Sequence, residues 1–180
     1  MLIPPLTISR GPWGGPCGVG CLILGLVVGG CAVDDRPSAA GALILIPRPV
    51  PIPAGSAHAR FQGGRQVAAS SRLDPYCELE IRTVSEQCQE ALPGRYRVLG
   101  QRFTLLLDPT TRLPALLTGF SCSDPLFQES FWRLGAEPDG NLHSLRCIRP
   151  IYHCVMLAPL TLDEVGTVTG PAVQVELPES

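Results

Sequence analysis

The stretch 77–83, with the sequence CELEIRT, decides how this chain folds. Its apolar and charged side chains alternate without a break, and successive side chains of a β-strand point to opposite faces of a sheet. The cysteine, leucine and isoleucine therefore share one face, and the two glutamates and the arginine share the other. This pattern predicts a half-buried strand of an antiparallel sheet, with Cys77, Leu79 and Ile81 in the core.

The acidic residues of this stretch allow two interpretations. Glu78 and Glu80, together with Glu86 and Glu90, could supply the paired carboxylates of an acid–base site. A solvated strand face that lies opposite arginine side chains explains the alternation more simply. We therefore expect these glutamates on the surface and predict no catalytic residue among them.

Turn signals on both sides of the stretch divide the neighbouring sequence into further strands. Gly63-Gly64 predicts a two-residue hairpin between 59–62 and 65–68, and Pro93-Gly94 predicts a turn before another alternating segment. The apolar face of that segment is expected to include Tyr96, Val98, Phe103, Leu105 and Leu107, with 115–118 as a returning partner strand. The alternate prolines of 47–53 exclude a central strand and predict an extended edge or a polyproline-like connector.

The segment 119–141 is less regular than the strands before it. Residues 119–141 are expected to cap one end of the core through aromatic side chains, and Pro150 is expected to separate two strands, 142–148 and 152–157. Thr161 and Glu164 have the spacing of a capping box, which predicts one short helix near residues 161–168. A last strand is expected at 173–177. The predicted fold class is mostly β: a single small antiparallel β-sandwich or barrel-like domain over residues 43–180.

The chain contains eight cysteines, enough for disulfide bonds to form. Cys77 lies on the core face of its strand, and Cys147 lies in another predicted strand. A disulfide between them closes a 70-residue loop and is the preferred pairing, with Cys77–Cys154 as the alternative and two buried thiols as a third possibility. Closing such a loop should stabilise the fold by about 4 kcal/mol.

The N-terminal segment carries the clearest localisation signal. An apolar stretch, 19–28, is followed by Gly29, Gly30 and Cys31. This segment resembles the lipobox that ends a bacterial lipoprotein signal peptide, a class-level motif rather than a family of domains. The resemblance implies that residues 1–30 are a signal peptide, that Cys31 is lipidated, and that 31–42 form a tether. Because Ala32, not Asp, follows the cysteine, it also implies an outer-membrane lipoprotein that faces the periplasm.

Two alternatives to the lipoprotein interpretation stay open. The apolar and glycine residues of 17–33 could form an uncleaved anchor, although the stretch is short for a membrane-spanning helix. A plain secreted protein is the other. Arg10 is the only positive charge before the apolar stretch, and prolines precede it, which departs from an ordinary signal peptide.

Composition argues against several functional classes. The 14 basic residues are all arginine, they are scattered, and the net charge is −2, so no nucleic-acid partner is expected. His143, Cys147, His153 and Cys154 lack the spacing of a structural zinc site, and we predict no metal or other cofactor. Cys122, with His143 or His58 as its base, is the one candidate for a cysteine-dependent hydrolase or transpeptidase.

These observations lead to one functional hypothesis and one alternative. We expect a non-enzymatic outer-membrane lipoprotein that holds an envelope protein or a cell-wall component, with strand addition at a sheet edge as the physical route. The alternative is a periplasmic enzyme centred on Cys122. The sequence alone names neither the partner nor the oligomeric state.

Overall fold

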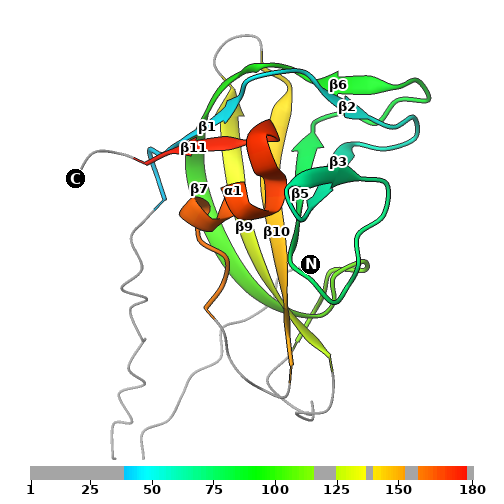
Figure 1. Ribbon diagram of the computed structural model, residues 1–180, viewed down its shortest axis with the longest axis vertical. Coiled ribbons are helices and arrows are strands. Elements are labelled where there is room, and N and C mark those ends of the chain that lie inside the picture. Colours follow the sequence, from blue (N-terminus) through cyan, green and yellow to red (C-terminus); the bar gives the residue numbers. More distant parts are fainter. Residues whose placement is uncertain (1–38, 116–124, 137–139, 153–157, 178–180) are drawn as a thin grey trace, which may run out of the picture. The chain divides into compact units, whose positions relative to one another are not determined.

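The computed structural model describes residues 39–115, 125–136, 140–152 and 158–177. They belong to a compact unit that runs from Arg36 to Ser180. This unit is mostly β, with one short helix, and its main sheet curls into a half-barrel (Figure 1). The predicted fold class, a small antiparallel barrel-like domain, is confirmed.

Eleven strands lie within the described residues. Their bounds are β1 Leu43–Ile46, β2 Val50–Ile52, β3 His58–Gln62, β4 Arg65–Val67, β5 Tyr76–Ile81, β6 Gln89–Ala91, β7 Gly94–Asp108, β8 Leu113–Pro114, β9 Leu126–Ala136, β10 Leu142–Ile151 and β11 Gln174–Glu176. Helix α1, Leu162–Thr169, is followed by a 3-10 turn, η1, Gly170–Ala172.

The main sheet has the strand order β11-β1-β7-β9-β10-β5-β3-β4, and β8 pairs with β7. Each of these pairs is antiparallel. The strand predicted at 77–83 is present as β5, Tyr76–Ile81, which ends two residues earlier than predicted and lies inside the sheet between β3 and β10. The proline-rich segment contributes β2, which pairs only with β6 in a separate two-stranded sheet, in agreement with the extended edge that the prolines predict.

The hydrophobic core fills the concave face of the half-barrel. Figure 1 shows α1 in front of β9 and β10, between β1 and β11 on one side and β3 and β5 on the other. Val165 of α1 packs in one cluster with Cys77 and Leu79 of β5 and with Trp132 of β9, all of them buried. The apolar face expected for β5 is thus in the core.

Specific local contacts determine where α1 begins and where it ends. The backbone N–H of Thr161 donates to the Glu164 carboxylate at 2.9 Å, which is half of the predicted capping box. At the other end Gly170 has φ +61°, and a Cβ there would collide with the carbonyl oxygen of Gly64. The Gly63-Gly64 hairpin therefore contacts the end of the helix as well as joining β3 to β4.

Three expectations need correction. The segment 119–141 was expected to be irregular, yet β9 is an eleven-residue strand between β7 and β10. Its alternation is obscured because polar residues are buried on both of its faces: Ser130 on the concave side, where its hydroxyl donates to the Leu160 carbonyl, and Glu129 on the other.

Pro150 does not divide two strands. β10 runs through it to Ile151, because β5 pairs only as far as Ile148 and β10 beyond that point is bordered by β9 alone. A proline that needs no hydrogen bond on its open side fits there. The expected strand at 152–157 falls mostly outside the described residues. Most of the partner strand predicted at 115–118 also lies outside them; just before it, β8 pairs with β7, which is also bordered by β1 and β9.

The folded domain begins before residue 43, the boundary expected from the sequence. Ala42 is fully buried, and its carbonyl accepts a hydrogen bond from the backbone N–H of Val98 at 2.8 Å. The domain therefore includes residues from Ala39 onward. Residues 1–38, with the expected signal peptide and Cys31, lie outside the described part of the chain.

Cys77 and Cys147 are joined by a disulfide. They are direct partners across the β5–β10 ladder, and both are fully buried. This is the pairing that the sequence analysis preferred. Cys122 and Cys154 lie outside the described residues, and Cys88 is a free, exposed thiol.

We predict that replacing both Cys77 and Cys147 by Ala lowers the free energy of unfolding by about 4 kcal/mol, because the unfolded chain loses the constraint of a long closed loop. Urea denaturation with and without reductant measures this. Reductant should destabilise the wild type and leave the double variant unchanged, and Cys88→Ala serves as the control. Equal midpoints for wild type and double variant without reductant would contradict the prediction.

Candidate functional site

A cluster of buried charges lies on the face of the sheet opposite to α1. Glu78 of β5 is the direct cross-strand partner of Arg60 on β3 and of Arg146 on β10. Directly opposite residues share a face, so these three side chains form a row across neighbouring strands. Glu129 on β9 completes the cluster beside Arg146.

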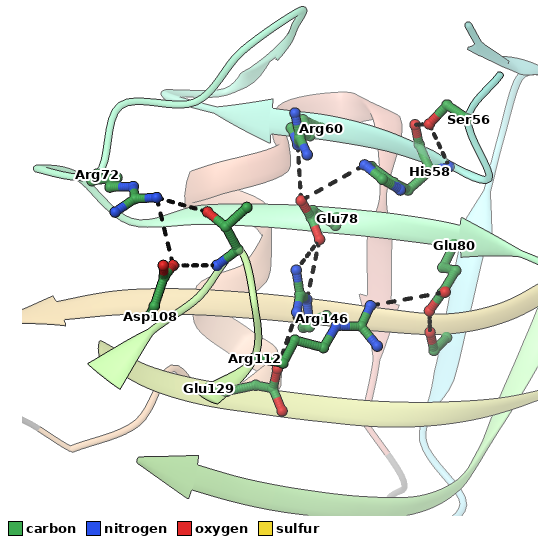
Figure 2. Close-up of polar contacts among 12 residues, drawn as sticks. Ser56, His58, Arg60, Arg72, Glu78, Glu80, Asp108, Arg112, Glu129 and Arg146 are labelled. Atoms are coloured by element: carbon green, nitrogen blue, oxygen red, sulfur yellow. Dashed lines mark hydrogen bonds and ion pairs between the residues drawn. The ribbon is translucent and has the colours of Figure 1, made fainter. Parts of the chain in front are cut away.

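The distances show tight pairing (Figure 2). The Arg60 Nε donates to Glu78 Oε1 at 2.8 Å, and the Arg146 Nε donates to Glu78 Oε2 at 3.1 Å. The Nη2 of Arg146 also donates to Glu78 Oε2, so that Arg146 binds this oxygen twice. The Nη1 of Arg146 donates to Glu129 Oε2 at 3.3 Å. The three nitrogens of the Arg146 guanidinium, Nε, Nη1 and Nη2, therefore each donate to a carboxylate oxygen.

The expectation of a solvated face is wrong for Glu78. Its exposed fraction is only 5%, equal to that of Arg146, and Glu129 is 3% exposed. The predicted arginine partners are correct, but the face is covered. A second apolar cluster of Tyr76, Leu106, Phe127 and Ile148 lies on this side of the sheet. The turn between β7 and β8 lies beside the charged row, and Arg112 extends from it toward Glu80 (Figure 2).

The electrostatics of Glu78 follow from this enclosure. Burial acts to raise the pKa of its carboxyl, but the nearby Arg146 and the hydrogen bonds from Arg60 and Arg146 outweigh burial, and the pKa is lowered from 4.5. Burial likewise acts to lower the pKa of Arg146, and Glu78 and Glu129 raise it. The pair is thus charged in the folded protein, at a desolvation cost that its hydrogen bonds offset.

A polar pocket of about 260 Å³ opens onto this cluster. Its wall combines residues from β3, β5 and β10 with the β4–β5 and β7–β8 connections: His58, Arg60, Ala69, Ser70, Arg72, Tyr76, Glu78, Pro109, Thr110, Arg112 and Arg146. Four arginines and one glutamate therefore line the same pocket, and two of these arginines, Arg60 and Arg146, contact the glutamate. We call this the arginine pocket.

Two acidic residues outside the wall hold the arginines at the mouth. The Arg72 Nη2 donates to Thr110 Oγ1 at 2.8 Å and lies 3.5 Å from Asp108 Oδ1. The Arg112 Nη2 lies 3.9 Å from Glu80 Oε1, and Glu80 also accepts a hydrogen bond from the Ser144 hydroxyl. Glu78 and Glu80 share a face as expected, but they pair with arginines rather than with each other: Glu78 with Arg60 and Arg146, and Glu80 with Arg112.

The candidate residues for metal binding and catalysis are not assembled into a site in the described part of the chain. Cys147 is in the disulfide, His143 lines a shallow hollow with Arg133, and His58 lines the arginine pocket. Cys122, His153 and Cys154 lie outside the described residues, so the hydrolase hypothesis stays a prediction. Within the described ranges no group of three or more His, Cys, Asp or Glu side chains could hold a metal ion.

A second hollow of about 480 Å³ lies beside the proline-rich segment, between Pro49, Phe61 and Pro171. It is less polar than the arginine pocket. Among the described helices, none is both long enough and apolar enough to cross a membrane.

Comparison of this chain with protein-family models, with curated proteins and with solved structures finds no match. The functional argument therefore depends on the residues themselves. Of these, the arginine pocket brings together the most charged side chains from different parts of the chain. Sequence reasoning missed it because its arginines, at 60, 72, 112 and 146, are far apart in the sequence.

We predict that Arg146→Met lowers the free energy of unfolding by about 3–5 kcal/mol, because it leaves two buried carboxylates, Glu78 and Glu129, without this partner. Glu78→Gln should cost less, since Arg146 keeps Glu129. Arg95→Met is the matched control: its pair with Glu176 is exposed and should contribute no more than about 1 kcal/mol. Urea denaturation orders the three variants, and an Arg146→Met protein as stable as Arg95→Met would show that the cluster contributes nothing.

A second prediction concerns pH. Because the folded-state pKa of Glu78 is lowered from 4.5, this group contributes stability above that pH and loses the contribution as the pH falls through the folded-state value. The Glu78→Gln variant should therefore lose less stability than the wild type between neutral pH and pH of about 3. Thermal or urea unfolding across this range tests it; parallel pH profiles for the two proteins would refute the role of Glu78.

Proposed function

We propose that this chain is a lipid-anchored, non-enzymatic binding protein of the bacterial outer membrane, with its β-domain in the periplasm. The observation that carries the proposal is the segment 19–31, in which an apolar stretch ends in Gly29, Gly30 and Cys31. The Cys77–Cys147 disulfide supports export, because such bonds persist in oxidising compartments such as the periplasm.

The domain offers two routes to a partner. The edge strands β4 and β11 have only three residues each, with charged residues Arg65 and Glu176 among them, and short charged edges discourage strand addition. The arginine pocket, by contrast, presents convergent donors beside a buried ion cluster. We therefore favour the pocket over the sheet edges as the binding site of the domain.

The anchor is tested by the intact mass of the membrane-extracted protein. We expect a chain that begins at Cys31 and carries a diacylglycerol and a fatty acid. Cys31→Ala should be released to the soluble fraction or remain unprocessed. Cys21→Ala is the control, because Gly18 stands three positions before Cys21, where a lipobox usually has a branched apolar residue such as Val28. Correct processing and unchanged membrane association of Cys31→Ala would refute the lipoprotein proposal.

A further inference from the structure

We propose that the arginine pocket binds a phosphate group, either as free phosphate or as the monoester of a small molecule or lipid headgroup. The inference rests on one part of the proposed function, that this is a binding domain, and it names the class of ligand. It does not require the lipid anchor. Its evidence is the arginine-rich wall of the pocket, the donors that its arginines retain and the backbone of Arg112.

The first observation is the set of charged residues that line the pocket. Arg60, Arg72, Arg112 and Arg146 line the pocket together with a single carboxylate, Glu78. That carboxylate is already bound by Arg60 and Arg146. Outside the wall, Asp108 and Glu80 lie near Arg72 and Arg112. An anion that enters therefore meets a wall rich in guanidinium groups and competes with these two carboxylates for the exposed arginines, while the buried pair of Glu78 and Arg146 is satisfied.

The second observation is that the arginines at the mouth retain donors for a ligand. Arg60 uses its Nε for Glu78, and its two terminal nitrogens have no partner among the described residues. Arg72 and Arg112 have side chains that are 57% and 55% exposed, and their nearest carboxylate oxygens lie at 3.5 and 3.9 Å, beyond ordinary hydrogen-bond length. Figure 2 shows Arg60 beside Glu78, Arg72 beside Asp108, and Arg112 reaching toward Glu80.

The third observation is the backbone of Arg112. Its φ is +56°, the one positive value at a non-glycine residue in the described part of the chain. A side chain in the left-handed region is disfavoured, and glycine or asparagine takes such a turn position more readily. The turn between β7 and β8 thus carries an arginine where a glycine would fit with less strain, which is the pattern of a residue kept for its guanidinium.

The chemistry of the pocket favours phosphate over a carboxylate. A guanidinium presents paired N–H donors that match two oxygens of one anion. Three guanidinium groups around one pocket suit an anion with at least three terminal oxygens and two negative charges, whereas a carboxylate has two oxygens and one charge. The volume of about 260 Å³ accepts a phosphate with a small organic substituent.

The test is binding of inorganic phosphate and of glycerol phosphate to the purified full chain, by calorimetry at matched ionic strength, with acetate as the carboxylate probe. We expect binding of both phosphates and weaker or no binding of acetate. Arg112→Gly should weaken phosphate binding about tenfold or more, as expected for a lost charge-assisted contact, while its thermal midpoint is unchanged or raised. Arg72→Gln should weaken binding to a similar degree.

Arg95→Gln is the matched control, because its side chain has the same exposed fraction as that of Arg72, 57%, and lies outside the pocket wall. It should bind phosphate like the wild type. Binding of the Cys31→Ala chain to phosphatidylcholine vesicles only when they contain phosphatidic acid would assign the phosphate to a lipid; binding of the soluble probes alone would assign it to a small molecule.

Three results would overturn the inference: no phosphate binding by the wild type, equal binding by Arg112→Gly and the wild type, or equal affinity for acetate and phosphate. These outcomes are separate from those of the anchor experiment. A chain that is not lipidated and still binds phosphate refutes only the lipoprotein proposal, and a lipidated chain that binds no phosphate refutes only the ligand.

Discussion

The pairing of β5 with β10 is the constraint on which the rest of the domain depends. On consecutive rungs of this ladder, Cys77 faces Cys147 and Glu78 faces Arg146. The disulfide lies in the core beneath α1, and the ion pair lies on the other face of the sheet. A slip of one residue would exchange the two faces and place Glu78 in the apolar core, so both interactions specify the same register.

Burying the charged cluster costs desolvation free energy. Buried ion pairs contribute little net stability compared with apolar residues of the same size, although removing one partner is strongly destabilising. In this domain the cost is limited because Glu78 accepts from two arginines and Arg146 donates to two carboxylates. Glu78 and Arg146 form the buried base of the pocket. Arg72 and Arg112, which lie on more exposed connections, line its mouth.

The two faces of the half-barrel therefore serve different purposes in our interpretation. The concave face, with α1 and the larger apolar cluster, supplies the stability of the domain. The other face joins a smaller apolar cluster to the arginine pocket and is the part that we propose meets a ligand.

The sequence by itself determined the features that depend on neighbouring residues. Alternation in 77–83 predicts β5 and its core face, Gly63-Gly64 predicts the hairpin, and the Thr161–Glu164 spacing predicts the start of α1. Each follows from local geometry: side-chain direction along a strand, turn preference or capping. The antiparallel, mostly-β class follows from the same local signals.

Only the tertiary structure decided what covers the second face of the sheet. Alternation separates the two faces of β5 but does not say that the β7–β8 turn encloses Glu78, and it fails for β9, which buries polar residues. The continuation of β10 through Pro150 depends on where β5 stops. The arginine pocket joins residues 60, 72, 112 and 146, and such contacts between distant positions arise from chain topology rather than from any local pattern.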